Sequence, residues 1–326
     1  MEIKIESIVD LLQIKGMGRR TALKICKHLD FSPKSDEWYD VLVKFALDNP
    51  NFRMPVLNKA AIKEAFKKST QIFEKSENAN VKILSYFDSQ YPESLKSIAD
   101  PPLIINVKGD VNKLRTLVGV AIIGTREPSE AGLKAGVYFS KALAEMGFNI
   151  VSGLAKGCDA AAHQGSLQAG GMTTAVLAHG LHTVYPKENR GLAEKILDSG
   201  GILMSEYLFG TGALSNYFVE RDRLQSGLSV ATIVIQTAQT GGTMHAVRAT
   251  LNSKKKLAAV KYGSRELGIE KIEGNEMLIR NGEAFSLSSS NLIEFVNTFY
   301  PSKLENSNKR VSNPDQMSQT QLKLDI

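Results

Sequence analysis

Apolar positions in the first part of the chain recur three and four residues apart, the spacing that predicts helices packed through one face. No strand-like alternation competes with this pattern over residues 1–75, and the stretch 59–73 continues it. We therefore expect a small all-helical domain over residues 1–75. The positions that define it are Ile8, Leu11, Leu12, Ile14, Ala22, Ile25, Leu29, Ile62, Ala65, Phe66 and Phe73.

The pattern changes near residue 80, where short apolar runs begin to alternate with segments of helical length. Such runs are typical of parallel strands buried on both faces. They predict an α/β fold, an extended Rossmann-like, doubly wound and mostly parallel sheet over residues 80–297, with ligands at the carboxyl ends of the strands. The predicted strands are 103–107, 118–124, 148–151, 173–177, 201–204, 231–236 and 256–260, and two of the predicted helices are 130–146 and 245–251.

The last part of this domain is predicted to hold a hairpin of residues 277–279 and 284–287, followed by a helix over 291–299. From residue 302 onward Asn, Ser, Gln, Lys and Asp dominate and apolar residues become sparse. We therefore expect residues 302–326 to form a polar, mostly disordered tail.

Composition narrows the class of protein. Of 326 residues, 43% are hydrophobic and 23% are charged, and the net charge of +6 leans only mildly toward polyanionic partners. Cys26 and Cys158 lie far apart without a CxxC motif, which indicates neither a disulfide framework nor a zinc ribbon. No secretion signal and no apolar run near the ~20 residues of a membrane helix is visible. We expect a soluble, cytoplasmic protein without a membrane segment.

The most informative motif is Ser152-Gly153-Leu154-Ala155-Lys156-Gly157, which follows an apolar run and opens into an Ala-rich helix. Such a turn presents free backbone N–H groups at the positive end of a helix dipole, and Lys156 adds a cation, which together suit a phosphate. Gly124-Thr125-Arg126 and Gly241-Gly242-Thr243 follow two other predicted strands in the same way. Because parallel strands end at one edge of a sheet, we expect these turns to form one phosphate-binding site.

Several kinds of chemistry lack their usual residues. The turn at Gly124 is not GxGxxG and no acidic residue ends the next strand, so no dinucleotide cofactor is expected. Ser152 has no His in its turn, and Asp159 is suited to stabilising the start of a helix. His179 and His182 have no Cys, Asp or Glu at ligand spacing, so no metal site is expected. These observations favour a binding protein without a cofactor over an enzyme.

Two further clusters are basic. Phe218, Arg221 and Arg223, together with Lys187, combine a base-stacking ring with cations, although a core Phe beside a solvated Arg pair is an alternative. The run Lys15-Gly16-Met17-Gly18-Arg19-Arg20 joins two predicted helices and matches the helix-hairpin-helix pattern, in which N–H groups and arginines meet DNA phosphates. Such hairpins also serve only to pack small helical domains, and both interpretations stay open.

With these residues identified, the chain resembles the DprA family, also called Smf or DNA-processing protein A, from about Val81 to Phe295. Gly124-Thr125-Arg126 stands where the family usually has Gly-Ser-Arg, and residues 152–163 are close to a full match. Further matching segments follow in family order. They are 83–92, 101–103, 108–110, 180–181, 185–186, 205–206, 227–229, 274–279 and Gly282.

The resemblance implies a Rossmann-like protein that binds single-stranded DNA without regard to sequence, protects it and passes it to a RecA-type recombinase. In the family this serves DNA uptake in natural transformation, and recombination. Members also self-associate, so a homodimer is expected. The family pattern places Arg126, Ser152, Gly153 and Lys156 in the phosphate pocket, with Arg221 and Arg223 beside it.

The chain also departs from the family pattern. The usual Arg-Asn-Arg is Arg221-Asp222-Arg223, Ser-Gly-Ser-Leu is replaced by Gly241-Gly242-Thr243-Met244, and Ala-Val-Pro-Gly ends as Ala259-Val260-Lys261-Tyr262. No winged-helix pattern is visible near the C-terminus. Two alternatives therefore stay open: a nucleotide-handling enzyme similar to the LOG phosphoribohydrolases, and a defence-associated sensor of DNA or a nucleotide. The first is disfavoured because no Glu follows Thr243 at the start of the helix.

Overall fold

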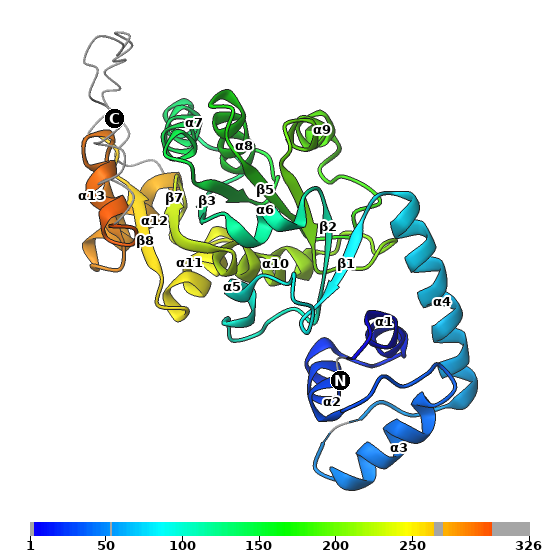
Figure 1. The fold of residues 1–326 in the computed structure, drawn as a ribbon. Helices are drawn as coiled ribbons and strands as arrows, with labels where there is room; N and C mark the ends of the chain where they lie inside the picture. Colours follow the sequence, from blue (N-terminus) through cyan, green and yellow to red (C-terminus); the bar gives the residue numbers. More distant parts are fainter. Residues whose placement is uncertain (1–2, 53, 264–269, 302–326) are drawn as a thin grey trace.

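The computed structural model describes residues 3–52, 54–263 and 270–301 (Figure 1). Its N-terminal region is helical, as predicted. The last helix of this region, α4, begins after Asn58, whose side chain accepts hydrogen bonds from the N–H groups of Ala60 and Ala61. The apolar faces of these helices share one core with Leu103 and Ile104, so the region packs directly on the sheet. The helices are α1 (Ile5–Gln13), α2 (Arg19–His28), α3 (Trp38–Asp48) and α4 (Lys59–Asn78).

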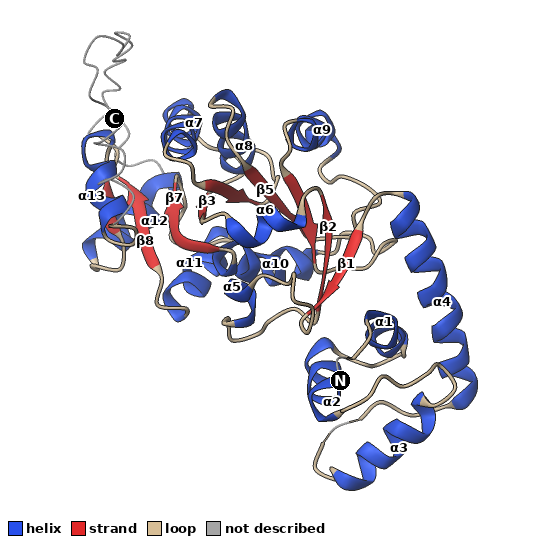
Figure 2. Ribbon diagram, viewed as in Figure 1, coloured by secondary structure: helices blue, strands red, loops and turns tan. Residues whose placement is uncertain are grey.

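The remainder is a nine-stranded sheet with helices on both faces (Figure 2). The strand order is β1-β2-β6-β5-β4-β3-β7-β8-β9. Every pairing from β6 to β9 is parallel. β1 pairs antiparallel with β2, and β2 pairs antiparallel with β6. The predicted α/β fold is thus confirmed. The strands are β1 (Lys82–Ser85), β2 (Ile104–Lys108), β3 (Gly119–Ile123), β4 (Asn149–Ser152), β5 (Thr173–Leu177), β6 (Ile202–Ser205), β7 (Ser229–Val234), β8 (Lys256–Val260) and β9 (Phe285–Leu287).

The helices that connect these strands determine where a ligand can bind. After β3 the chain continues to β4 on one side, and after β7 it continues to β8 on the other, so the direction of winding reverses between β3 and β7. Open sheets of this kind bind ligands at such a switch point. The helices of this part are α5 (Glu93–Lys96), α6 (Val111–Thr116), α7 (Glu130–Glu145), α8 (Cys158–Gln168), η1 (Lys187–Asn189), α9 (Arg190–Asp198), α10 (Ser215–Gly227), α11 (Thr243–Asn252), α12 (Glu270–Arg280), η2 (Ser289–Asn291) and α13 (Leu292–Asn297).

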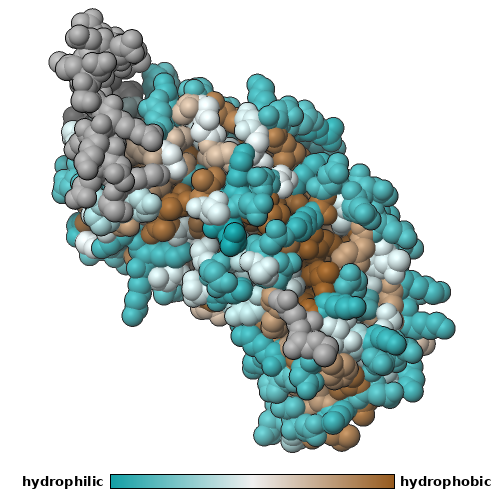
Figure 3. Space-filling model, viewed as in Figure 1, coloured by the Kyte–Doolittle hydropathy of each residue, from teal (hydrophilic) through white to brown (hydrophobic). Residues whose placement is uncertain are grey.

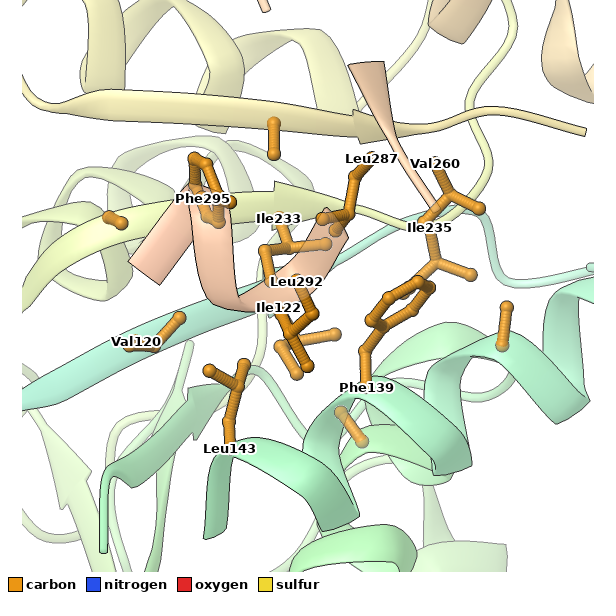
Figure 4. Packing of buried hydrophobic residues seen from close by; sticks show 14 of the residues in the cluster. Val120, Ile122, Phe139, Leu143, Ile233, Ile235, Val260, Leu287, Leu292 and Phe295 are labelled. Atoms are coloured by element: carbon orange, nitrogen blue, oxygen red, sulfur yellow. The ribbon is translucent and has the colours of Figure 1, made fainter. Parts of the chain in front are cut away.

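The central strands are buried along their whole length, which explains their continuous apolar sequence. On one face, Phe139 and Leu143 of α7 pack against Ile122 of β3 and Ile233 of β7 (Figure 4). This packing joins α7 to β3 and β7, the two strands at the switch point.

One predicted element is wrong. Residues 277–279 form no strand but lie inside α12, and β9 pairs in parallel with β8 instead of closing a hairpin. Asn275 anchors this helix, because its buried side chain donates to the carbonyl oxygens of Ile235 and Val260 at 2.8 and 3.0 Å. A three-residue apolar run is too short to separate strand from helix. The predicted tail, 302–326, lies outside the described residues.

The structure bears on membrane insertion as well. Over the described ranges, the helices are all too short or too polar to cross a bilayer.

Candidate functional site

A pocket of about 600 Å³ opens at the switch point between β3 and β7. The turn after β3, helix α10 and the loop between β7 and α11 supply most of its walls. The structure therefore brings together many of the residues expected at a phosphate site. The predicted residues that line the pocket are Gly124, Thr125, Arg126, Ala155, Phe218, Arg221, Gly241, Gly242 and Thr243.

The turn after β3 is held tightly. The Thr125 N–H donates to the carbonyl of Gln236 at 2.8 Å, and the Thr125 carbonyl accepts from the Cys158 N–H at 3.1 Å. A Cβ added at Gly124 would lie 2.5 Å from Cys158 Sγ, so only glycine allows this approach. Arg126 follows directly and is exposed at the pocket edge.

The turn from Ser152 to Gly157 was expected to present free backbone N–H groups, and in the structure two of these groups are bonded. Its Gly153 and Ala155 N–H groups are not free, because both donate to the Asp159 carboxylate, at 3.1 and 3.3 Å. Leu154 is buried with φ at 59°, a conformation that costs energy for a residue other than glycine. Asp159 thus fills the place that the sequence suggested for a phosphate.

Several predicted site residues lie outside the pocket lining. They are Ser152, Gly153, Leu154, Lys156, Gly157, Lys187 and Arg223. The exposed Lys156 ammonium pairs with Glu188 at 2.5 Å, and Lys187 is exposed at the start of η1. Ser152 Oγ donates to the Ile122 carbonyl at 2.7 Å, which ties β4 to β3.

Arg221 forms part of the pocket floor and is only 4% exposed. Its Nη1 donates to the Val176 carbonyl at 2.8 Å, and its Nε lies 3.2 Å from an Asp222 carboxylate oxygen. A Cβ at Gly153 would come within 1.6 Å of Arg221 Nη1, so Gly153 makes room for the guanidinium. With its amide oriented toward these donors, Gln225 accepts from Gly153 N–H and Arg221 Nη1 at 2.8 and 2.9 Å.

The pocket contains acids as well as cations. Burial raises the pKa of Asp222 to about 7; the charges of Arg221 and Arg126 oppose this shift and that of Asp159 adds to it. Burial raises the pKa of Asp159 too. The floor is therefore close to electrically balanced, and the exposed Arg126 supplies the cation nearest to solvent.

An aromatic surface lies beside this cation. The Arg126 guanidinium carbon is 5.1 Å from the centroid of the Phe218 ring, within cation–π range. The ring of Tyr185 lies 5.6 Å from that of Phe218. Phe218 is half-buried and lines the pocket, so its ring is accessible to a ligand.

Arg223 faces the other way, toward the N-terminal region. Its Nη2 donates to both carboxylate oxygens of Glu206, at 2.8 and 2.7 Å. Arg19 bonds Asp100 and Glu220, each at 2.6 Å. Arg20 also bonds Asp100, at 2.8 Å. We call this network of Arg19, Arg20, Asp100, Glu206, Glu220 and Arg223 the latch.

The arginines of the glycine hairpin belong to the latch. Arg19 and Arg20 are bonded to acids of the sheet domain rather than presented to solvent as a phosphate site. Lys15, Gly16 and Gly18 remain exposed in the connection between α1 and α2, with Gly16 at φ 86°.

Sequence reasoning missed Tyr185, Thr237 and Gln225 as pocket residues. Gln225 could have been found, because it lies one helical turn after Arg221 on the face of α10 that carries Phe218 and Asp222. No sequence signal places Tyr185, because its position depends on the order of strands.

Comparison with known proteins decides the family. The sequence profile of DNA recombination-mediator protein A matches residues 82–297. The chain belongs to this family. The match covers the sheet domain, including every segment that lines the switch-point pocket.

Individual relatives agree with this assignment. The chain is 32% identical over 204 residues to protein Smf of Escherichia coli, covering 63% of this chain and 54% of that protein. It is 33% identical over 202 residues to the DNA processing protein DprA of Bacillus subtilis, covering 62% of this chain and 68% of that protein. The match thus spans little more than half of the Escherichia coli relative.

Solved structures extend the likeness to the whole fold. DNA processing protein A of Streptococcus pneumoniae superposes with a TM-score of 0.74 at 27% identity, covering 90% of this chain and 98% of that one. DNA processing protein A of Helicobacter pylori, described with a unique single-stranded DNA binding mode, superposes with a TM-score of 0.59 at 28% identity, covering 67% and 94%.

Proposed function

We propose that this chain binds single-stranded DNA at the switch-point pocket without regard to sequence, protects the strand and delivers it to a RecA-type recombinase. The observation that carries the proposal is the pairing of Arg126 with Phe218 at the mouth of the pocket. A cation beside an aromatic face suits a phosphate followed by an unpaired base. Membership in the family and the DNA-binding relative from Helicobacter pylori support the same ligand.

The binding mode follows from which groups are available. Exposed Arg126 contacts a phosphate, the Gly241-Gly242-Thr243 turn offers backbone approach to the strand, and Phe218 stacks on a base. None of these groups reads a base edge, so affinity depends on the backbone charge and on salt. Transfer to the recombinase and action as a homodimer, in DNA uptake or recombination, are proposed from the family resemblance.

Fluorescence anisotropy with Arg126→Ala tests this assignment. The variant should lose about 10- to 100-fold in affinity for a labelled single strand, because a charge-assisted contact contributes about 1.5–3 kcal/mol. Its slope of log affinity against log salt should fall by about 0.7. Arg115→Ala, an exposed arginine on α6 away from the pocket, is the matched control. Equal affinities for the two variants would remove Arg126 from the site.

One observation favours a second candidate, a small nucleotide. Asp222 and Asp159 place carboxylate oxygens at the pocket wall, where they could accept hydrogen bonds from ribose hydroxyls. Competition of nucleotides against the labelled strand separates the two candidates. Displacement by a nucleotide at micromolar concentration, with weak binding of the strand itself, would favour the nucleotide.

Delivery to the recombinase requires a separate assay. Strand exchange by a RecA-type recombinase on DNA coated with single-strand-binding protein should be faster in the presence of this chain. No acceleration, with DNA binding intact, would restrict the function to binding and protection.

A further inference from the structure

A second groove, of about 490 Å³, lies in the N-terminal helical region between α3 and α4. Ile62 is buried at its floor, and Tyr39 and Phe66 are half-buried beside it. Apolar surface bordered by hydrophilic side chains is visible in this region of the molecule (Figure 3). The groove shares no lining residue with the switch-point pocket.

A row of lysines forms one edge of this groove. Lys59, Lys63 and Lys67 lie four residues apart on α4, so their successive Cα atoms are about 6 Å apart along the helix axis. All three side chains are exposed, and within the described residues none forms an ion pair. Like charges at this spacing lower the stability of a helix, so the row is not explained by the stability of α4.

Aromatic rings lie at the foot of this row. The Lys59 ammonium is 4.8 Å from the centroid of the Tyr39 ring, and Phe66 lies between Lys63 and Lys67 in the lining of the groove. Among the described residues of the lining, Asp36 is the acidic one, against three lysines. The groove therefore combines exposed cations along α4 with aromatic rings in its lining.

We propose that this groove is a second contact for single-stranded DNA, with phosphates along Lys59, Lys63 and Lys67 and bases against Tyr39 and Phe66. This inference rests on the proposed function. A nucleic-acid strand repeats one charge and one ring in every unit, and the groove combines a row of three lysines with two aromatic rings. An acidic protein segment would also meet the lysines, but it carries a planar ring only where its sequence supplies an aromatic residue, whereas every nucleotide carries one. The proposal therefore commits to the nucleic acid.

The test compares two double variants of the full chain. Lys63→Ala with Lys67→Ala removes two cations from the groove, and Lys68→Ala with Lys75→Ala removes two exposed cations of α4 that do not line it. Both pairs make the same change in net charge and in helix propensity. The groove variant should lose about tenfold or more in affinity for a labelled 40-nucleotide strand, and its salt slope should fall by about 1.4. The control should change by less than about twofold.

Two more variants separate stacking from charge. Lys63→Arg with Lys67→Arg should keep the native affinity, because the charges remain. Tyr39→Leu, which keeps apolar volume but removes the ring face, should lose about fivefold or more. Circular dichroism checks that each variant keeps its helices.

The outcomes distinguish this inference from the proposed function. If native protein binds the strand and Arg126→Ala weakens it, but groove and control variants bind alike, the groove inference is wrong and the proposed function stands. If native protein binds no single strand, both fail. Unchanged DNA affinity in the groove variant, with loss of binding to an acidic peptide, would assign the groove to a protein partner and overturn the inference.

Discussion

Asp222 places a titratable carboxylate where a phosphate is expected to approach. Burial raises its pKa to about 7, with Arg221 and Arg126 opposing the shift and Asp159 adding to it. The carboxylate is therefore charged at pH 8 and mostly neutral at pH 6. Because the charged form repels an anion, DNA affinity should rise as the pH falls from 8 to 6, by up to about tenfold per pH unit for one proton.

Anisotropy titrations at pH 6, 7 and 8 measure this effect. Asp222→Asn should bind tightly at all three pH values, with a nearly flat profile. Glu127→Gln removes an exposed carboxylate from the same pocket and should keep the native pH dependence. A native profile that is flat, or that rises toward pH 8, would contradict the assigned titration.

Some site residues could be predicted because strand ends meet at one edge of a parallel sheet. Gly124 and Arg126 follow β3 directly, so their place in the pocket needed only the sheet. The burial of Arg221 could not be predicted in the same way. It depends on α10 crossing close to Gly153, an approach between distant segments that leaves no periodic pattern in the sequence.

At the scale of elements, α10 serves two regions of the molecule. Phe218, Arg221 and Asp222 face the switch-point pocket, whereas Glu220 and Arg223 belong to the latch that holds α2. The start of α2 is thus bonded to the same helix that lines the pocket. A shift of α10 would therefore disturb both the pocket lining and the ion pairs of the latch.

Arg19→Ala tests the latch. Removal of Arg19 leaves Asp100 and Glu220 with fewer partners, so the free energy of unfolding should fall by about 2–3 kcal/mol. Arg20→Ala is the control, since its side chain is 76% exposed and should cost less than about 1 kcal/mol. Urea unfolding of both variants measures the difference. Equal losses would mean that the Arg19 contacts contribute no more than surface pairs.

Elements were predictable where the apolar pattern was long. The strands from β2 to β8 follow continuous runs, whereas α12 was mistaken for half of a hairpin. Its apolar triplet at 277–279 resembles a strand, and the contacts that hold it as a helix come from Asn275, whose partners lie in β7, just after it, and in β8. A polar anchor of this kind is set by tertiary packing and not by local periodicity.

At the scale of the whole molecule, Asp100 and Asp222 have pKa values that are shifted in opposite directions, and both contribute to the dependence of stability on pH. Burial alone would raise the pKa of Asp100, but hydrogen bonds from Arg20 and Arg19 and nearby charges lower it to about 2. Asp100 therefore contributes stability above its unfolded pKa of 3.8, and this contribution is lost as the pH falls toward 2. Asp222, whose pKa is raised, contributes stability below 3.8 that is lost as the pH rises through 7.

Buried His163 opposes Asp222 over part of this range, because burial lowers the pKa of His163 to about 3 and the unfolded chain takes up a proton below the ordinary value of 6.5. The effect of Asp222 is therefore isolated by comparing the native chain with Asp222→Asn. In differential scanning calorimetry, the native Tm minus that of Asp222→Asn should fall from pH 5 to pH 8, by at least about 2–4 °C, the shift that 1 kcal/mol produces at this size. The fall in Tm below pH 4, to which Asp100 contributes, should remain in Asp222→Asn. In Asp100→Asn that fall should be smaller, because the variant lacks the carboxylate that titrates in the latch. A Tm difference between the native chain and Asp222→Asn that stays constant from pH 5 to pH 8 would contradict the raised pKa of the buried Asp222 carboxylate.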